Sequence, residues 1–197
     1  RFSSTYRALR QEVRAPRLIE CRRMNPPTGR AVDVDVVLDL MIHDIDLVLS
    51  LVRAPVAQVD AVGVPVLTGS VDIANARLRF EGGPVANITA SRVSRERLRK
   101  IRMFQPSGYL SLDLAAGTGE YLRLREGVVL GSPGAEMPQL PEIVERIELG
   151  GDGREPLRAE LEAFVSAVTG SGRLVVSGED GRRALAVALD IMRRSEE

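Results

Sequence analysis

The strongest constraint on the fold is a series of short segments after residue 56 in which apolar and polar residues alternate. Clear examples are DIANARLRF at 72–80, PVANITASR at 84–92 and GYLSLDLA at 108–115. A period of two is typical of strands that bury one face. Gly- and Pro-containing turns at 81–84 and 106–108 separate these segments, so consecutive strands should pair antiparallel.

Segments with helical periodicity surround and interrupt these strands. We expect helices at 3–14, 36–52, 154–169 and 179–195, and additional strands at 17–24 and 143–149. Ser3 or Ser4 can cap the first helix and Ser177 the last. The pattern predicts one α+β domain over 1–197, with a large, open, mostly antiparallel sheet and helices packed on one face.

Composition excludes several classes of protein. The 27 basic residues balance the 27 acidic ones and only 4% of residues are aromatic, so we expect neither a nucleic-acid nor a membrane partner. A single cysteine, Cys21, cannot form an internal disulfide and predicts a small core residue in a cytoplasmic protein. A single histidine makes a metal site improbable.

The segment 36–52 is the most informative helix. Twelve of its seventeen residues are apolar and they are spread all round the helix, which predicts burial on most sides. Four ionisable groups interrupt the segment and argue against a membrane span.

The polar residues of this helix share one face. At about 100° per residue, Asp35, Asp39, His43, Asp46, Ser50 and Arg53 fall within about a quarter of a turn. Asp33 and Asp44 fall on the opposite side. A polar stripe on a buried helix predicts a cleft, a partner or satisfied polar groups in the core.

Asp39 and His43 are four residues apart, so their side chains can meet. A carboxylate beside an imidazole orients it and raises its pKa, which makes the pair a general acid/base device near neutral pH. The alternative is a structural histidine, which base rates favour for a lone His on an apolar helix. Compensation of the helix N-terminus accounts for Asp35 and for Asp39, but not for Asp46.

Several motifs occur in the order found in one protein family. These are Arg1-Phe2, Arg22-Arg23-Met24-Asn25-Pro26, Asp39-x-x-x-His43-x-x-Asp46, Ser91-Arg92-x-Ser94, Gly108 to Asp113, Glu155-Pro156-Leu157 and Ser177 to Gly181. Together they resemble the C-terminal domain of the Gfo/Idh/MocA oxidoreductases, the glucose–fructose oxidoreductase and inositol dehydrogenase family.

The resemblance implies the substrate-binding and oligomerisation domain of a two-domain NAD(P)-dependent oxidoreductase, with a fold like the C-terminal domain of dihydrodipicolinate reductase. It implies His43 as catalytic acid/base with Asp39 as its partner, and Arg23, Asn25 and Asp46 as substrate contacts. The substrate would be a sugar or nucleotide sugar, because His43-Asp44-Ile45-Asp46 is usual in the nucleotide-sugar subgroup. The assembly would be a homodimer or tetramer formed through the sheet.

The cofactor domain that this family carries has no counterpart in the sequence. No G-x-G-x-x-G motif and no E-K-P motif is present, so we expect no Rossmann domain in this chain. NAD or NADP would be bound mainly by a missing N-terminal domain. The isolated chain should therefore lack dehydrogenase activity.

Some alternatives remain open at this point. The whole chain could be a non-catalytic sheet module for oligomerisation or ligand holding. Arg23 could be a surface charge and Asn25 a turn-former. Arg95 and Arg97, within a basic stretch at 92–102, could grip a phosphate or simply charge a solvated strand edge. Ala76, Leu78 and Phe80 should face the core.

Overall fold

The computed structural model describes residues 1–29, 33–128 and 139–195 and confirms an α+β domain built on one eight-stranded sheet. The strand order is β2-β3-β4-β1-β5-β6-β7-β8. In chain order the strands are β1 (Leu18–Met24), β2 (Val56–Val64), β3 (Ile73–Phe80), β4 (Val85–Ser91), β5 (Leu98–Gln105), β6 (Gly108–Asp113), β7 (Thr118–Leu124) and β8 (Val144–Glu148).

All pairings are antiparallel except that of β1 with β4. The expected tight turns are present, and positive φ angles explain their glycines. Gly82 and Gly83 have φ of 80° and 102° in the β3–β4 turn. At Gly108 φ is 140°, and a Cβ there would lie 2.1 Å from the carbonyl oxygen of Leu122, so only glycine fits.

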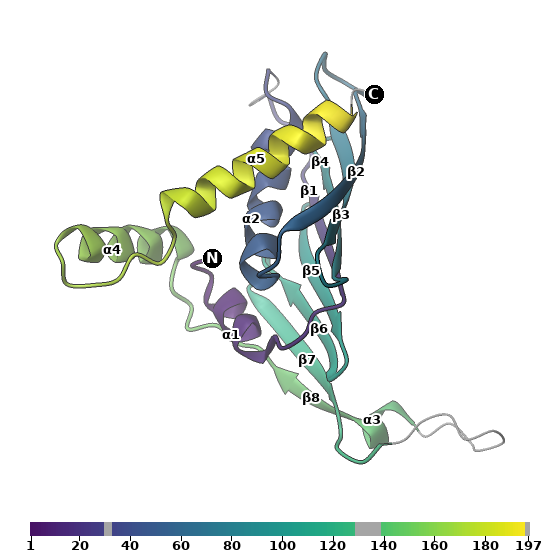
Figure 1. The fold of residues 1–197 in the computed structure, drawn as a ribbon, viewed down its shortest axis with the longest axis vertical. Coiled ribbons are helices and arrows are strands. Elements are labelled where there is room, and N and C mark those ends of the chain that lie inside the picture. Colours follow the sequence, from purple (N-terminus) through teal and green to yellow (C-terminus); the bar gives the residue numbers. More distant parts are fainter. Residues whose placement is uncertain (30–32, 129–138, 196–197) are drawn as a thin grey trace.

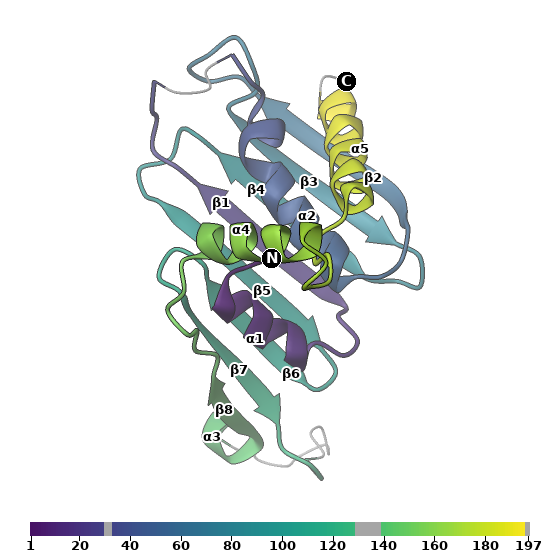
Figure 2. The ribbon, with the colours of Figure 1, turned by 90° about the vertical axis from the view of Figure 1, so that its left-hand side faces the viewer.

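Helices cover one face of the sheet (Figures 1 and 2). The helical elements are α1 (Ser4–Glu12), η1 (Val37–Met41), α2 (Ile42–Leu51), α3 (Leu140–Ile143), α4 (Pro156–Val168) and α5 (Gly178–Ser195). α2 lies against the middle of the sheet, and α5 crosses over α2 and β2. The predicted caps are present, because Ser3 Oγ accepts from Tyr6 N–H and Ser177 Oγ accepts from Asp180 N–H.

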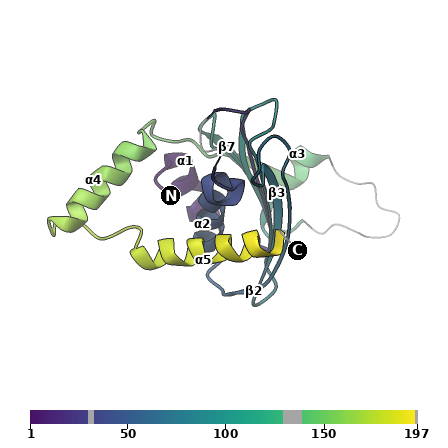
Figure 3. The ribbon, with the colours of Figure 1, turned by 90° about the horizontal axis from the view of Figure 1, so that it is seen from above.

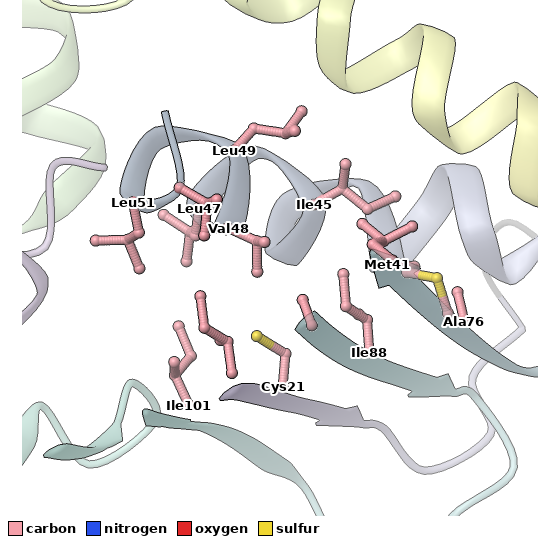
Figure 4. Close-up of a cluster of buried hydrophobic side chains, with 14 of the residues drawn as sticks. Cys21, Met41, Ile45, Leu47, Val48, Leu49, Leu51, Ala76, Ile88 and Ile101 are labelled. Carbon is pink, nitrogen blue, oxygen red and sulfur yellow. The ribbon is translucent and has the colours of Figure 1, made fainter. Parts of the chain in front are cut away.

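The core lies between α2 and the central strands (Figure 4). Val48 points from the helix towards Cys21 on β1, Met41 points towards Ala76 on β3, and all four side chains are buried. Ala76, Leu78 and Phe80 face this core as predicted.

The helix predicted at 36–52 differs in its first turn. Residues Val37–Met41 form a π-helical turn, in which Ile42 N–H donates to Val37 O, and the α-helix begins only at Ile42. Asp35 precedes this turn, and its carboxylate accepts from Val37 N–H at 2.7 Å, which supports helix-terminus compensation for this residue. π-helical turns are frequent at functional sites.

α4 differs from the other long helices because it stands away from the sheet (Figures 1 and 3). None of its residues is buried, and its predicted apolar stripe of Leu157, Leu161, Phe164 and Val168 is exposed to 57–70%. Within the described ranges, no helix is both long and apolar enough to cross a membrane.

Candidate functional site: a hollow around His43

A hollow of about 580 Å³ opens on the helix-covered side of the sheet. Its walls come from the N-terminal part of α1, the junction of η1 and α2, the ends of β1 and β5, and the first turns of α4. The charged and titratable groups that line it are Arg1, Tyr6, Arg23, Asp39, His43, Asp46, Arg99 and Glu160. Four of the five predicted site residues therefore meet in one place.

The side chain of His43 is exposed at this hollow, in the first turn of α2. Its pKa is lowered from the ordinary 6.5, first by burial and then by the positive charge of Arg23; Arg99 acts in the same direction. Asp44 and Asp39 raise it, with Asp39 the weaker of the two. The expectation of a raised pKa is wrong, because the sequence spacing showed one carboxylate but neither the burial nor the two arginines that outweigh it.

Asp39 lies in the π-helical turn, one turn before His43. Both side chains line the hollow, but no hydrogen bond or ion pair joins them in the part of the chain that the structure describes. Asp39 therefore acts on His43 through space and not through a direct contact.

Arg23 is buried, not a surface charge. Its Nε and Nη2 donate to the two carboxylate oxygens of Asp44 at 2.9 and 2.8 Å, which fixes the guanidinium at the wall of the hollow. Asp44 itself is only 3% exposed. The sequence placed Asp44 opposite the polar stripe but gave no sign of its partner, which lies 21 residues earlier on β1.

Asp46 forms a second bidentate pair. Arg1 donates from Nε at 2.8 Å and from Nη2 at 2.6 Å to its two carboxylate oxygens, and Arg1 also lies 3.4 Å from Asp180. The acidic position that helix-terminus compensation left unexplained thus anchors the N-terminal segment to α2. Contact of Asp46 with substrate stays a prediction.

Asn25 follows β1 and is not among the described residues that line the hollow. Its backbone N–H donates to Ser91 O at 2.8 Å, and its carbonyl oxygen accepts from Ser94 N–H. Its side-chain Oδ1 is buried without a hydrogen-bond partner in the described ranges. Its role as a substrate contact stays a prediction.

The far end of the polar stripe serves a different purpose. Ser50 Oγ donates to Leu47 O and also bonds the hydroxyl of Tyr6, which ties α1 to α2. Ser50 and Arg53 line a separate hollow of about 540 Å³. The single polar stripe predicted from the sequence is therefore divided between two hollows.

The described residues offer neither a cluster that would bind a metal ion nor, in this hollow, a motif that would bind a dinucleotide. No cluster of three or more His, Cys, Asp or Glu side chains among them could hold a metal ion. The hollow has no glycine-rich turn at a helix N-terminus, which is how a Rossmann domain binds a pyrophosphate. The arrangement can exchange a proton at His43 and bind charged groups through its arginines.

The structure thus combines an open eight-stranded sheet with a hollow on its helix-covered side that His43 lines. The sequence model described as the GFO/IDH/MocA C-terminal domain matches residues 9–110. The chain belongs to this family.

Individual relatives agree with this assignment. UDP-N-acetylglucosamine 3-dehydrogenase from Acidithiobacillus ferrooxidans is 39% identical over 177 residues, covering 90% of this chain and 54% of the relative. A solved structure of that enzyme superposes with a TM-score of 0.85 at 37% identity, over 98% of this chain and 59% of the other. The chain thus spans little more than half the length of these relatives.

A more distant structure shows the same fold. It is scyllo-inositol dehydrogenase from Lactobacillus casei, solved with bound NAD(H) and scyllo-inositol. Its TM-score is 0.69 at 19% identity, over 99% of this chain and 60% of the other.

Proposed function

We propose that this chain is the substrate domain of a nicotinamide-dependent dehydrogenase that interconverts a secondary alcohol and a ketone on a nucleotide sugar, with His43 as the general acid/base. The observation that carries the proposal is the position of His43 in a hollow whose arginines and burial lower its pKa. The sequence likeness to a UDP-N-acetylglucosamine 3-dehydrogenase supports the choice of substrate.

The electrostatics of the hollow suit proton removal. Because the pKa of His43 is below 6.5, the imidazole is neutral at pH 7 and has a free lone pair to accept a hydroxyl proton. Asp39 and Asp44 stabilise the imidazolium that forms, and this stabilisation opposes the effect of the two arginines. In the reverse direction the same imidazolium returns the proton to the ketone oxygen.

The bound nicotinamide, NAD or NADP, supplies the hydride acceptor or donor for this reaction. We propose that it is held mainly by a further domain of the full-length protein, since this chain covers only 54% and 59% of the two relatives. In such an arrangement this chain alone has no dehydrogenase activity. The side chains of the hollow bind and orient the substrate and move its proton.

The direct test is His43→Ala in the full-length protein, assayed with UDP-N-acetylglucosamine and either nicotinamide cofactor. We expect kcat to fall by about 10²–10⁴, the usual contribution of a general acid/base. Arg95→Gln is the matched control, because Arg95 is exposed and does not line the hollow. A His43→Ala variant within severalfold of wild type would reject the proton-transfer role.

The pH profile provides a second test of the same role. With His43 as base, kcat/KM should fall on the acid side with an apparent pKa below 6.5, and Asp39→Asn should move that limb to lower pH because a charge that raises the pKa of His43 is lost. An acid limb that does not move in Asp39→Asn would separate Asp39 from the proton transfer.

The uncovered sheet face supports a proposal about assembly. Phe104 and Tyr109 pair across β5 and β6 on that face, with ring centroids 5.0 Å apart, and Phe104 is 38% exposed. We propose that this face forms a homodimer or tetramer in the cytoplasm. Sedimentation of Phe104→Glu should show dissociation; an unchanged mass would exclude this face as the contact.

A non-catalytic sheet module remains the second candidate function. The Phe104 and Tyr109 pair favours it equally, because assembly needs no redox chemistry. Assembly without any His43-dependent turnover of the full-length protein would support the module over the enzyme.

A further inference from the structure

The charges around His43 do not all have partners. Three arginines line the hollow, and two of them are neutralised, Arg1 by Asp46 and Arg23 by Asp44. Arg99 is the third. Its guanidinium forms no ion pair and no hydrogen bond with any residue that the structure describes, and its Nε is buried without a partner.

The register of the sheet explains why Arg99 is there. β1 pairs with β5 so that Arg23 lies directly opposite Arg99, and the buried pair Cys21 and Ile101 follows on the same face. Both arginines therefore point to the helix-covered side. Two like charges directly opposite each other are destabilising unless an anion compensates them.

Among the described residues, Asp44 is the carboxylate that forms an ion pair with this pair of arginines, and it does so with Arg23. Asp44 binds Arg23 bidentately and uses both oxygens to do so. Asp39 and Glu160 also line the hollow, but neither forms an ion pair with Arg99 within the described ranges. Burial, followed by the charges of Arg23 and Arg97, lowers the pKa of Arg99, and Asp44 is the acidic residue that opposes this.

We propose that Arg99 binds a phosphate oxyanion of the substrate beside His43. This inference rests on the proposed function and names the substrate group that the hollow recognises. A guanidinium presents a planar fork of N–H donors that matches a phosphate, and charge-assisted bonds of this kind are the strong ones. The diphosphate of a nucleotide sugar supplies that group.

Arg99 is better placed to bind a phosphate near His43 than the two arginines that the sequence suggested. Arg95 and Arg97 are exposed, precede β5 and do not line the hollow. Arg99 lies only two residues after Arg97. It is the first basic residue on β5, and its side chain lines the same hollow as His43. Arg97→Gln is therefore a matched control for Arg99→Gln.

The experiment uses inorganic pyrophosphate and the 197-residue chain, whose only histidine gives one set of imidazole NMR signals. A bound anion beside His43 stabilises the imidazolium. We therefore expect saturating pyrophosphate to raise the pKa of His43 by about one unit in wild type and in Arg97→Gln. Arg99→Gln should abolish this rise, and Arg99→Lys, which keeps the charge but loses the fork, should weaken pyrophosphate binding by about tenfold.

Apart from the substituted residue, the charged and titratable groups that surround His43 must be the same in each comparison. They are Tyr6 and Arg1 from the N-terminal segment, Arg23 from β1, Asp39 from η1, Asp44 and Asp46 from α2, Arg99 from β5 and Glu160 from α4. Without pyrophosphate, Arg99→Gln should itself raise the pKa of His43, because one of the charges that lower it is removed. This shift also reports that the variant is folded around His43.

Two results would overturn the proposal: no response of His43 to pyrophosphate in wild type, or an equal response in Arg99→Gln. Neither result bears on the dehydrogenase reaction. Conversely, a full-length protein that does not turn over a nucleotide sugar, while pyrophosphate still acts through Arg99, would reject the proposed function and leave the anion site standing. In an active full-length protein, Arg99→Gln should raise KM for the nucleotide sugar by about tenfold or more and change kcat less.

Discussion

α2 and α4 have similarly apolar sequences, but the structure places them in opposite environments. Ile45 and Val48 of α2 are completely buried between the sheet and α5, whereas Leu161 and Val168 of α4 are 57% and 70% exposed. The comparison teaches that an apolar stripe shows that a helix needs a partner without showing where the partner is. In this chain α2 packs against the sheet and α5, whereas the apolar stripe of α4 is exposed.

The largest expected effect concerns the ion pairs of the two helices. Asp44→Ala on α2 leaves Arg23 buried without its carboxylate, and we expect a loss of about 3–5 kcal/mol in the free energy of unfolding. Glu162→Ala on α4 breaks an exposed pair with Arg158 and should leave stability unchanged. Urea denaturation of both variants measures the difference, and similar losses would show that α4 is also packed.

Truncation of apolar side chains should show the same contrast. Ile45→Ala creates a cavity under α2 and should cost about 2–5 kcal/mol, whereas Leu161→Ala should have no measurable effect in this chain. Cys21 reports the result, because burial raises the pKa of its thiol well above the ordinary value and keeps it unreactive until the core opens. Faster thiol labelling is expected in Ile45→Ala only.

The beginnings of the two helices differ as well. Val36, just before η1, donates its N–H to Val71 O, and this loop is held by the buried Asp72, whose carboxylate accepts from Val66, Leu67 and Thr68. α4 begins at Pro156, and its N-cap residue Glu155 makes no side-chain capping hydrogen bond. Asp72→Asn should therefore destabilise the chain by about 1.5–3 kcal/mol, the usual range for hydrogen bonds to a charged group.

The same carboxylate makes the chain sensitive to acid. Burial alone would raise the pKa of Asp72, but the backbone N–H groups and the Thr68 hydroxyl hold it far below the ordinary 3.8. The unfolded chain then binds more protons, so this stabilisation is complete above about pH 5 and is lost as the pH falls further. Urea midpoints between pH 2 and 5 should converge for wild type and Asp72→Asn; parallel curves would contradict this.

The smallest effect is expected where α1 joins α2. Tyr6 is buried, and its hydroxyl bonds Leu47 O at 3.1 Å as well as Ser50. Burial raises its pKa to about 12, so it remains protonated. Tyr6→Phe should cost about 0.5–1.5 kcal/mol in thermal unfolding, with the partly exposed Tyr109→Phe as a neutral control.

Much of the fold could be predicted from the sequence because local patterns encode it. Alternation gave the strands from β2 to β7, turn residues gave their antiparallel pairing, and Ser3 and Ser177 marked helix starts. The π-helical turn at Val37–Met41 could not be predicted, since a period of 3.6 fits the residues equally well on paper.

The candidate site could be predicted only in part, because its electrostatics depend on residues far apart in the chain. Asp39, His43 and Asp46 share one helix and were found from their spacing. The arginines that form ion pairs in the site or lower the pKa of His43 lie elsewhere in the chain. They are Arg1 at the N-terminus, Arg23 on β1 and Arg99 on β5. Only the β1–β5 register brings Arg23 and Arg99 together, and no local pattern encodes that register.

β1 occupies the slot between β4 and β5, and this position affects how the nascent chain folds. At about 5–20 residues per second, the ribosome finishes β1 several seconds before residues 85–91 and 98–105 exist to receive it. β4 and β5 are joined by only a few residues, so they could close into a hairpin that shuts β1 out. β1 must therefore insert between two strands that follow it in the chain, so this part of the sheet depends on non-local contacts, which form slowly.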